Sequence, residues 1–150
     1  MVLTAGDVAP TFELPDADGQ SVKLADFQDK WVVLYFYPRD NTPGCTKEAC
    51  GFRDAYAEYQ SSDVVVLGVS TDDAKSHTKF ATTYELPFPL LVDEGGAIAE
   101  QYGSYGLKKF MGKEYMGITR STFIIAPDGT LAKVYRKVKP EPHAQEVLKD

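Results

Sequence analysis

The two cysteines of this chain, Cys45 and Cys50, lie close together in the segment 42–50. Thr42 and Pro43 are typical of the cap and the first position of a helix, which places Cys45 in the first turn. Unpaired backbone N–H groups and the positive end of the helix dipole then face the sulfur, and a negative charge there gains roughly 0.3–1 kcal/mol. Because the thiolate is the reactive form of cysteine, this segment predicts that Cys45 is an activated nucleophile.

The helical period places the two cysteines on different faces of the predicted helix. An apolar stripe at steps of four, three, four and three faces inward and comprises Cys45, Ala49, Phe52, Tyr56 and Tyr59. Cys50 lies roughly 140° around the helix from Cys45, with Cα atoms about 8–9 Å apart, whereas a disulfide requires roughly 4.4–6.8 Å. The two sulfurs therefore cannot bond unless the first turns unwind, and Gly51, a poor helix former, makes unwinding easier.

The elements around this helix, which is expected to end near residues 61–63, indicate an α/β fold. Residues 32–37 and 64–70 are near-continuous apolar runs, typical of strands buried on both faces. A Pro-Asp-Gly turn predicts a hairpin of strands over 121–126 and 130–135. Further elements are expected as short strands over 11–14 and 22–24, a helix after 71–73, an extended segment over 86–92, and helices over 95–102 and 142–149.

Residues 105–119 contain three glycines and no clean period, and they are expected to be irregular. The order of the other elements gives a parallel βαβ core joined to an antiparallel pair. This order predicts a thioredoxin-like α/β sandwich: a central mixed sheet flanked by helices, with an extra N-terminal β-hairpin. No linker or repeat interrupts it, so residues 1–150 are expected to form a single domain.

The composition is that of a soluble globular protein, with 43% apolar and 25% charged residues in 150. A net charge of −6 and no cluster of Lys and Arg argue against nucleic acid and anionic membrane surfaces as partners. The first ten residues lack the basic and apolar regions of a signal peptide, and no apolar run approaches a membrane span. We expect a cytoplasmic protein, or an organellar one if a transit peptide was removed.

The segment 38–45 resembles the Pro-x-x-x-Thr-x-x-Cys signature of peroxiredoxins, the thiol peroxidases. The residues that follow, 46–50, are similar to the Q-type branch, also called bacterioferritin comigratory proteins. The segments 66–70, 88–91 and 119–123 are similar to that family as well. The resemblance therefore extends over nearly the whole chain.

The resemblance implies a two-step peroxidase cycle that serves antioxidant defence. Cys45 would be the peroxidatic cysteine, attacking hydrogen peroxide or an organic hydroperoxide to form a sulfenic acid. Cys50 would be the resolving cysteine, condensing with that sulfenic acid into an intramolecular disulfide, Cys45–Cys50. Thioredoxin or a similar dithiol protein would then reduce the disulfide. Relatives of the Q type also suggest a monomer.

Four neighbours of Cys45 have implied roles, and each also has a plainer interpretation. The Thr42 hydroxyl would donate a hydrogen bond to the peroxide, and Arg120 would hold the thiolate and the peroxide. Donors placed at the leaving oxygen stabilise the negative charge that develops on it. Pro38 would shield the sulfur, and Glu48 would orient the arginine. Alternatively, Thr42 is only a helix cap, Pro38 a turn residue, Arg120 a surface charge and Glu48 a solvated first-turn acid.

The sequence does not indicate a metal or another cofactor. His77 and His143 have no ligand spacing to the cysteines. Four large side chains of the irregular segment either line a pocket near the sulfur or pack beneath it: Phe110, Met111, Tyr115 and Met116.

Two other classes of function use the same cysteines. A redox-responsive binding module would switch the helix through Cys45–Cys50 and signal to a partner. A disulfide carrier like thioredoxin is disfavoured because its Cys-x-x-Cys spacing is absent. Repeated turnover of peroxide separates the enzyme from the sensor.

Overall fold

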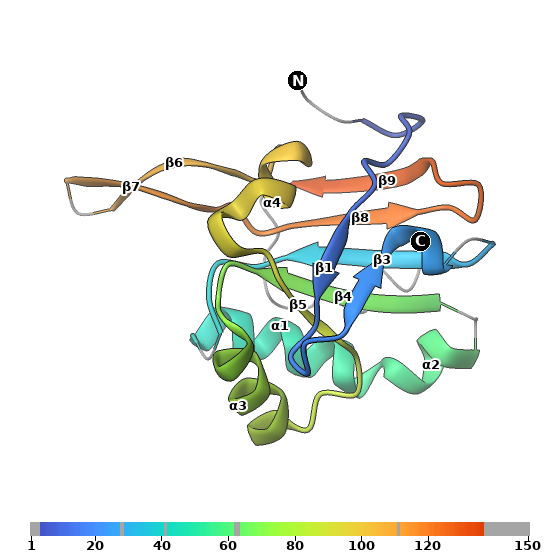
Figure 1. Ribbon diagram of the computed structural model, residues 1–150, viewed down its shortest axis with the longest axis horizontal. Coiled ribbons are helices and arrows are strands. Elements are labelled where there is room, and N and C mark those ends of the chain that lie inside the picture. The colour runs from blue at the N-terminus through green and yellow to red at the C-terminus, as the bar shows by residue number, and fades with distance from the viewer. Residues whose placement is uncertain (1–3, 28, 41, 62–63, 111, 137–150) are drawn as a thin grey trace.

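A five-stranded mixed sheet forms the centre of the computed structural model, which describes residues 4–27, 29–40, 42–61, 64–110 and 112–136 (Figure 1). The strand order is β5 (Leu90–Val92), β4 (Val64–Ser70), β3 (Trp31–Phe36), β8 (Ser121–Ile125) and β9 (Leu131–Arg136). The first three strands are parallel, while β8 runs antiparallel to both β3 and β9. The predicted parallel core with an attached antiparallel pair is confirmed.

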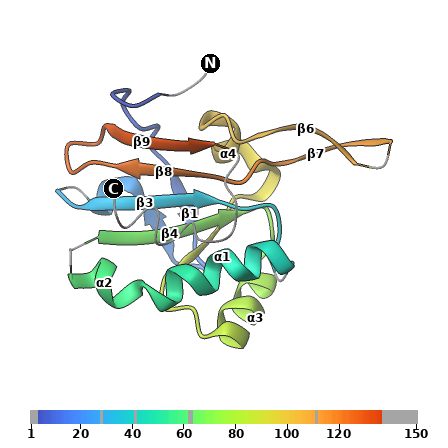
Figure 2. The ribbon, with the colours of Figure 1, turned by 180° about the vertical axis from the view of Figure 1, so that it is seen from behind.

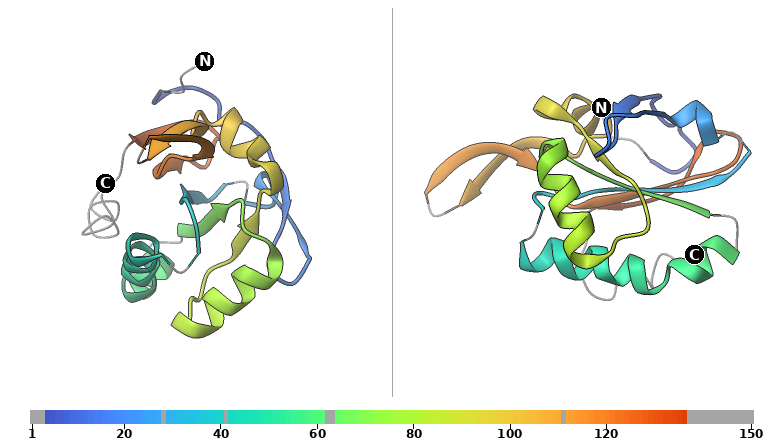
Figure 3. Two further views of the ribbon diagram at one scale, coloured as in Figure 1. Left: turned by 90° about the vertical axis from the view of Figure 1, so that its left-hand side faces the viewer. Right: turned by 60° about the horizontal axis from the view of Figure 1, so that its bottom comes forward.

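Helices cover one face of the sheet, and the N-terminal hairpin with a short helix covers the other (Figure 3). The first face carries α1 (Pro43–Asp54), α2 (Tyr56–Ser61) and α3 (Ala74–Tyr84). The second face carries β1 (Glu13–Pro15), β2 (Ser21–Lys23), the 3-10 helices η1 (Leu24–Phe27) and η2 (Glu94–Gly96), and α4 (Ala97–Gln101). The α/β sandwich and its N-terminal hairpin are as the sequence predicts.

The central strand β3 shows why two layers form on this sheet. Its residues alternate between two apolar clusters: Val33 and Tyr35 pack with the helices α1 to α3, whereas Leu34 and Phe36 pack with the N-terminal hairpin and α4. All of these side chains are buried. A strand covered on both faces has an unbroken apolar sequence, as residues 32–37 do.

The expectation that residues 105–119 are irregular is wrong. They form an antiparallel hairpin of β6 (Tyr105–Phe110) and β7 (Lys113–Ile118), which turns at Gly112 and extends away from the five-stranded sheet (Figures 1 and 2). Leu107 and Met116 face each other across the two strands and are 62% and 56% exposed. Because these apolar side chains lie on an exposed face, the apolar positions here do not follow the alternation that marks a half-buried strand.

Smaller differences concern helix ends. The helix expected to run from residue 43 to about 61 is divided at Ala55, where α1 ends and α2 begins. The predicted helix over 142–149 lies outside the described residues.

Candidate active site

The loop between β3 and α1 places Cys45 at the end of the sheet from which the β6–β7 hairpin extends (Figure 2). The strand ends at Phe36 and the helix begins at Pro43, so Cys45 lies in the first helical turn. Its side chain is 1% exposed and packs within the apolar cluster that includes Tyr35 and Phe52. The sulfur is thus buried at the positive end of the helix dipole, and it is this dipole that stabilises a negative charge there.

Thr42 occupies the cap position of α1, as predicted, but its side chain does not cap the helix. Its backbone carbonyl accepts from the N–H of Thr46 at 2.8 Å and closes the first turn. Its hydroxyl instead donates to the carbonyl of Arg39 at 3.1 Å. The N–H groups of Gly44 and Cys45 have no acceptor within the helix and lie in the turn that contains the sulfur.

Arg120 reaches the sulfur from the strand next to β3. Because β8 pairs antiparallel with β3, with Ser121 opposite Phe36, residue 120 lies beside the start of the loop that leads to α1. Its Nη2 donates to Cys45 Sγ at 3.3 Å, and its side chain is only 15% exposed. Burial acts to lower the pKa of Arg120, but the charges of Glu48 and Cys45 outweigh it, so the pKa is raised and the guanidinium keeps its charge.

Glu48 binds the other arm of the same guanidinium. Its Oε1 accepts from Arg120 Nη1 at 2.8 Å, and the residue is 1% exposed. Burial raises the pKa of Glu48 to about 7, against the opposing attraction of Arg120. Its Oε2 is buried without a hydrogen-bond partner among the described residues. The structure therefore rules out a solvated acid at Glu48 and an exposed surface charge at Arg120.

Cys50 lies in the same helix as Cys45 but in different surroundings. Both thiols are free; Cys45 is buried, whereas Cys50 is partly exposed. Residues 43–54 are continuous α-helix, so the Cα atoms of residues five apart are about 8–9 Å from each other. A bond between the two sulfurs would require part of this helix to unwind.

The remaining sequence candidates lie around the loop. Pro38 is half-buried and follows Tyr37 directly at the end of β3. Of the four large side chains left open between a pocket and packing, Met116 is exposed, and the side chains of the other three lie outside the described set. The hairpin that carries them joins β8 next to Arg120.

Asp40 and His77 are buried polar residues that sequence reasoning did not place in the site. Asp40 lies in the middle of the loop, and its Oδ2 is 2.6 Å from His77 Nδ1. One signal was present: His77 precedes Phe80 by three residues, on the inward stripe of α3, where a polar side chain needs a partner. The partner lies 37 residues away, and no local pattern could identify it.

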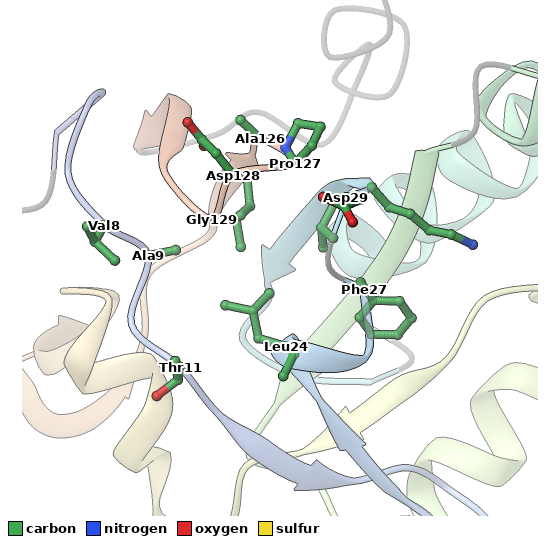
Figure 4. A pocket seen from close by; sticks show the side chains of 14 residues that line it. Val8, Ala9, Thr11, Leu24, Phe27, Asp29, Ala126, Pro127, Asp128 and Gly129 are labelled. Atoms are coloured by element: carbon green, nitrogen blue, oxygen red, sulfur yellow. The ribbon is translucent and has the colours of Figure 1, made fainter.

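Other places in the described residues do not resemble a reaction centre. No group of three or more His, Cys, Asp or Glu side chains there is placed to hold a metal. Nor is any helix in that part of the chain long and apolar enough to cross a membrane. A half-open cavity of about 370 Å³ lies between Val8, Leu24, Phe27 and Pro127 (Figure 4). It also contacts Val32, at the start of β3, so it lies at the end of the sheet opposite to Cys45.

The sequence profile described as the AhpC/TSA family matches residues 5–134. The chain is 49% identical to peroxiredoxin Bcp of Bacillus subtilis (strain 168) over 148 residues, which cover 99% of this chain and 94% of that protein.

Solved structures show the same likeness. A mutant of Xanthomonas campestris peroxiredoxin Q superposes with a TM-score of 0.90 and 36% identity, covering 98% of this chain and 96% of that one. The X. campestris bacterioferritin comigratory protein, in a trapped intermediate/ligand complex described for alkyl peroxide reduction, gives a TM-score of 0.91 and 34% identity, covering 99% and 93%. The thioredoxin-like architecture expected from the sequence is confirmed.

Proposed function

The chain belongs to the AhpC/TSA family and is a thiol peroxidase of the peroxiredoxin Q type, and from this premise we propose that Cys45 is its peroxidatic cysteine. The observation that carries the proposal is the bridge made by Arg120. One Nη atom contacts Cys45 Sγ at 3.3 Å while the other contacts Glu48 at 2.8 Å. A permanent positive charge therefore lies beside the sulfur, held in place by a buried carboxylate.

In the first step, the Cys45 thiolate attacks the terminal oxygen of the hydroperoxide. An S–O bond forms as the O–O bond breaks, and the electrons of the O–O bond leave with the other oxygen of the peroxide. That oxygen takes up a proton and departs as water or an alcohol, leaving a sulfenic acid. Negative charge thus moves from sulfur to the leaving oxygen. Arg120 and the first-turn N–H groups of α1 are fixed donors for these two positions, and the Thr42 hydroxyl joins them when it turns from the Arg39 carbonyl to the peroxide.

In the second step, Cys50 acts as the resolving cysteine. Its sulfur attacks the Cys45 sulfenic acid, a disulfide forms and water leaves. The separation of the two residues within α1 means that the first turns of the helix unwind for this step. Thioredoxin or a similar dithiol protein then reduces the disulfide and returns both thiols.

Pro38 and Glu48 have supporting roles in the proposal. Pro38 shapes the loop and shields the sulfur from water, which its half-buried place at the start of the loop supports. Glu48 orients Arg120, because the Oε1 contact leaves the guanidinium with one arm for the sulfur.

The substrates in this proposal are hydrogen peroxide and organic hydroperoxides. The alkyl peroxide reduction described for the X. campestris relative supports the second class. A coupled assay with hydrogen peroxide, an alkyl hydroperoxide and thioredoxin as reductant tests both classes. Many equivalents of peroxide consumed per protein are expected. One stoichiometric oxidation without turnover would instead indicate a redox sensor.

Two matched variants test the roles of the cysteines. Cys45→Ser is expected to abolish peroxide consumption. Cys50→Ser is expected to react once with peroxide and to accumulate the sulfenic acid, detected by mass spectrometry after trapping with dimedone. Turnover of Cys50→Ser with thioredoxin at the wild-type rate would contradict the assignment of Cys50, since no second cysteine remains to form the intramolecular disulfide.

We also propose a single domain over residues 1–150 that acts as a monomer in the cytoplasm; the resemblance to Q-type relatives is the support for the monomer. A single cooperative unfolding transition and a sedimentation mass near 16.6 kDa are expected. Two separate transitions, or a mass of twice that value, would overturn these points.

A further inference from the structure

Asp40 is a buried carboxylate held from three directions. Its side chain accepts hydrogen bonds from the hydroxyl of Tyr37, from Ser76 Oγ at 2.8 Å, and from His77 Nδ1 at 2.6 Å. Its backbone N–H donates to Asp72 Oδ2 at 2.7 Å. The middle of the loop between β3 and α1 is thus fixed to the start of α3 through side chain and backbone.

His77 is the cation of this cluster. It is completely buried, and its Nε2 lies 2.8 Å from the carbonyl of Leu91. Because a carbonyl oxygen only accepts, Nε2 carries a proton, while Nδ1 carries another toward Asp40. Burial acts to lower the pKa of His77, but the hydrogen bond and charge of Asp40, the Leu91 carbonyl and the charge of Asp72 together raise it. The geometry therefore assigns an imidazolium to His77, paired with the carboxylate of Asp40.

Asp40 and His77 fix the loop that leads directly to Thr42 and Cys45. Asp40 is two residues before Thr42, whose carbonyl closes the first turn of α1 and whose hydroxyl bonds the neighbouring Arg39 carbonyl. The loop is therefore fixed just before the residues whose donors would contact the peroxide. Arg120, by contrast, directly precedes the strand β8 and contacts the sulfur independently of the loop.

We propose that Asp40 and His77 form a positioning pair, which holds the loop so that Thr42 and the first-turn N–H groups of α1 meet both oxygens of the peroxide. The inference rests on the proposed function, because it concerns the same reaction at Cys45. It predicts a loss that is specific for peroxide. Misplacing donors by about 1 Å is enough to lower a rate by roughly 100-fold, whereas an alkylating reagent needs only an accessible thiolate.

The experiment compares two reagents in a Cys50→Ser background, where Cys45 is the single thiol. The rate constants of Cys45 with hydrogen peroxide and with iodoacetamide are measured for the parent and for His77→Asn, which retains a donor for Asp40 but no charge. We expect the peroxide rate constant to fall roughly 10- to 100-fold and the iodoacetamide rate constant to change by less than about twofold. The ratio of the two is the readout.

Two control variants separate positioning from general damage. Val66→Ala shortens a buried side chain of β4 in the apolar cluster that also contains Cys45. It is expected to lower the melting temperature without changing the ratio of the peroxide to the iodoacetamide rate constant. Thr78→Ala alters the exposed neighbour of His77 on α3 and is expected to leave both rates unchanged.

The outcomes separate a failure of the positioning role of His77 from a failure of the proposed peroxidase function. A ratio in His77→Asn equal to that of the parent overturns the positioning role. If His77→Asn does not fold, Tyr37→Phe and Ser76→Ala, which each remove one hydroxyl from Asp40, decide the matter: a lowered ratio supports the role, and an unchanged ratio in both overturns it. A parent protein that reacts with iodoacetamide but not with peroxide would refute the proposed function itself.

Discussion

Replacing Arg120 by Met tests two effects of the buried Arg120–Glu48 ion pair, its contribution to the stability of the fold and its contribution to the reaction. Met retains most of the apolar side-chain volume but removes the charge that faces Glu48 Oε1 and Cys45 Sγ. The carboxylate of Glu48 is then left buried without a partner. Removing one member of such a pair typically costs about 3–5 kcal/mol if the other stays charged.

The actual cost depends on pH because Glu48 can take up a proton. In the wild type its pKa is raised from 4.5 to about 7, so ionising Glu48 destabilises the fold as the pH rises through this range, with no further loss above it. Without Arg120 the pKa rises above 7, and the loss continues at higher pH. Each pH unit above 7 then adds about 1.4 kcal/mol to the difference between variant and wild type, or about 2 kcal/mol by pH 8.5.

Urea unfolding of the reduced proteins at pH 5.5 and pH 8.5 measures this difference. We expect Arg120→Met to lose more free energy of unfolding at pH 8.5 than at pH 5.5, by about 2 kcal/mol. The double variant Arg120→Met/Glu48→Gln is expected to lose this dependence on pH, since no buried carboxyl remains. Its peroxide rate constant is expected to stay about 100- to 1,000-fold below that of the wild type. Equal losses at both pH values, or a double variant as sensitive to pH as the single one, would refute the reasoning.

Three further predictions concern the loop, the helix and the sheet. Thr42→Val is expected to lower the peroxide rate constant at least about 10-fold while Thr42→Ser retains it, measured by stopped-flow competition; equal rates in both would contradict a hydroxyl role. Hydrogen exchange measured by mass spectrometry is expected to become faster over residues 46–52 on oxidation, and equal protection in both redox states would contradict the unwinding of α1. Gly68→Ala places a Cβ 2.9 Å from side-chain atoms of Leu90 and Tyr35, so we expect a loss of about 1–3 kcal/mol in urea unfolding; an unchanged midpoint would contradict it.

The sequence predicts those parts of the fold whose pattern reflects burial. Residues 32–37 are apolar throughout because β3 is covered on both faces, and the stripe that contains Cys45 and Phe52 follows the buried face of α1. The β6–β7 hairpin was missed for the same physical reason. Leu107 and Met116 are apolar but lie on an exposed face, so the apolar positions there do not reflect burial and the period that identifies a strand does not develop.

The candidate site divides in a similar way. Spacing within one continuous segment predicts an activated Cys45 and a helix cap at Thr42, whereas the resolving role of Cys50 and the donor role of Thr42 come from the resemblance. Arg120 was selected by resemblance, and the pairing of β3 with β8 supplies the physical reason for its place. Pairing of His77 with Asp40 depends on how α3 packs beside the loop, and a contact between polar residues 37 positions apart has no periodic signature.

The fixed ends of α1 explain how one helix can both activate Cys45 and unwind in the proposed cycle. Before the helix, Asp40 is fixed to the start of α3 through His77. Near its other end, Arg53 Nη1 donates to the carbonyl of Tyr84, at the end of α3, at 2.8 Å. Both anchors lie on one helix of eleven residues, about 16 Å long. Unwinding between them can bring Cys50 toward Cys45 while the flanking anchors persist. The contacts of Arg120 with Cys45 and with Glu48, which lies in the unwinding segment, are the ones at risk at the site. The reduced helix can then reform against the same anchors.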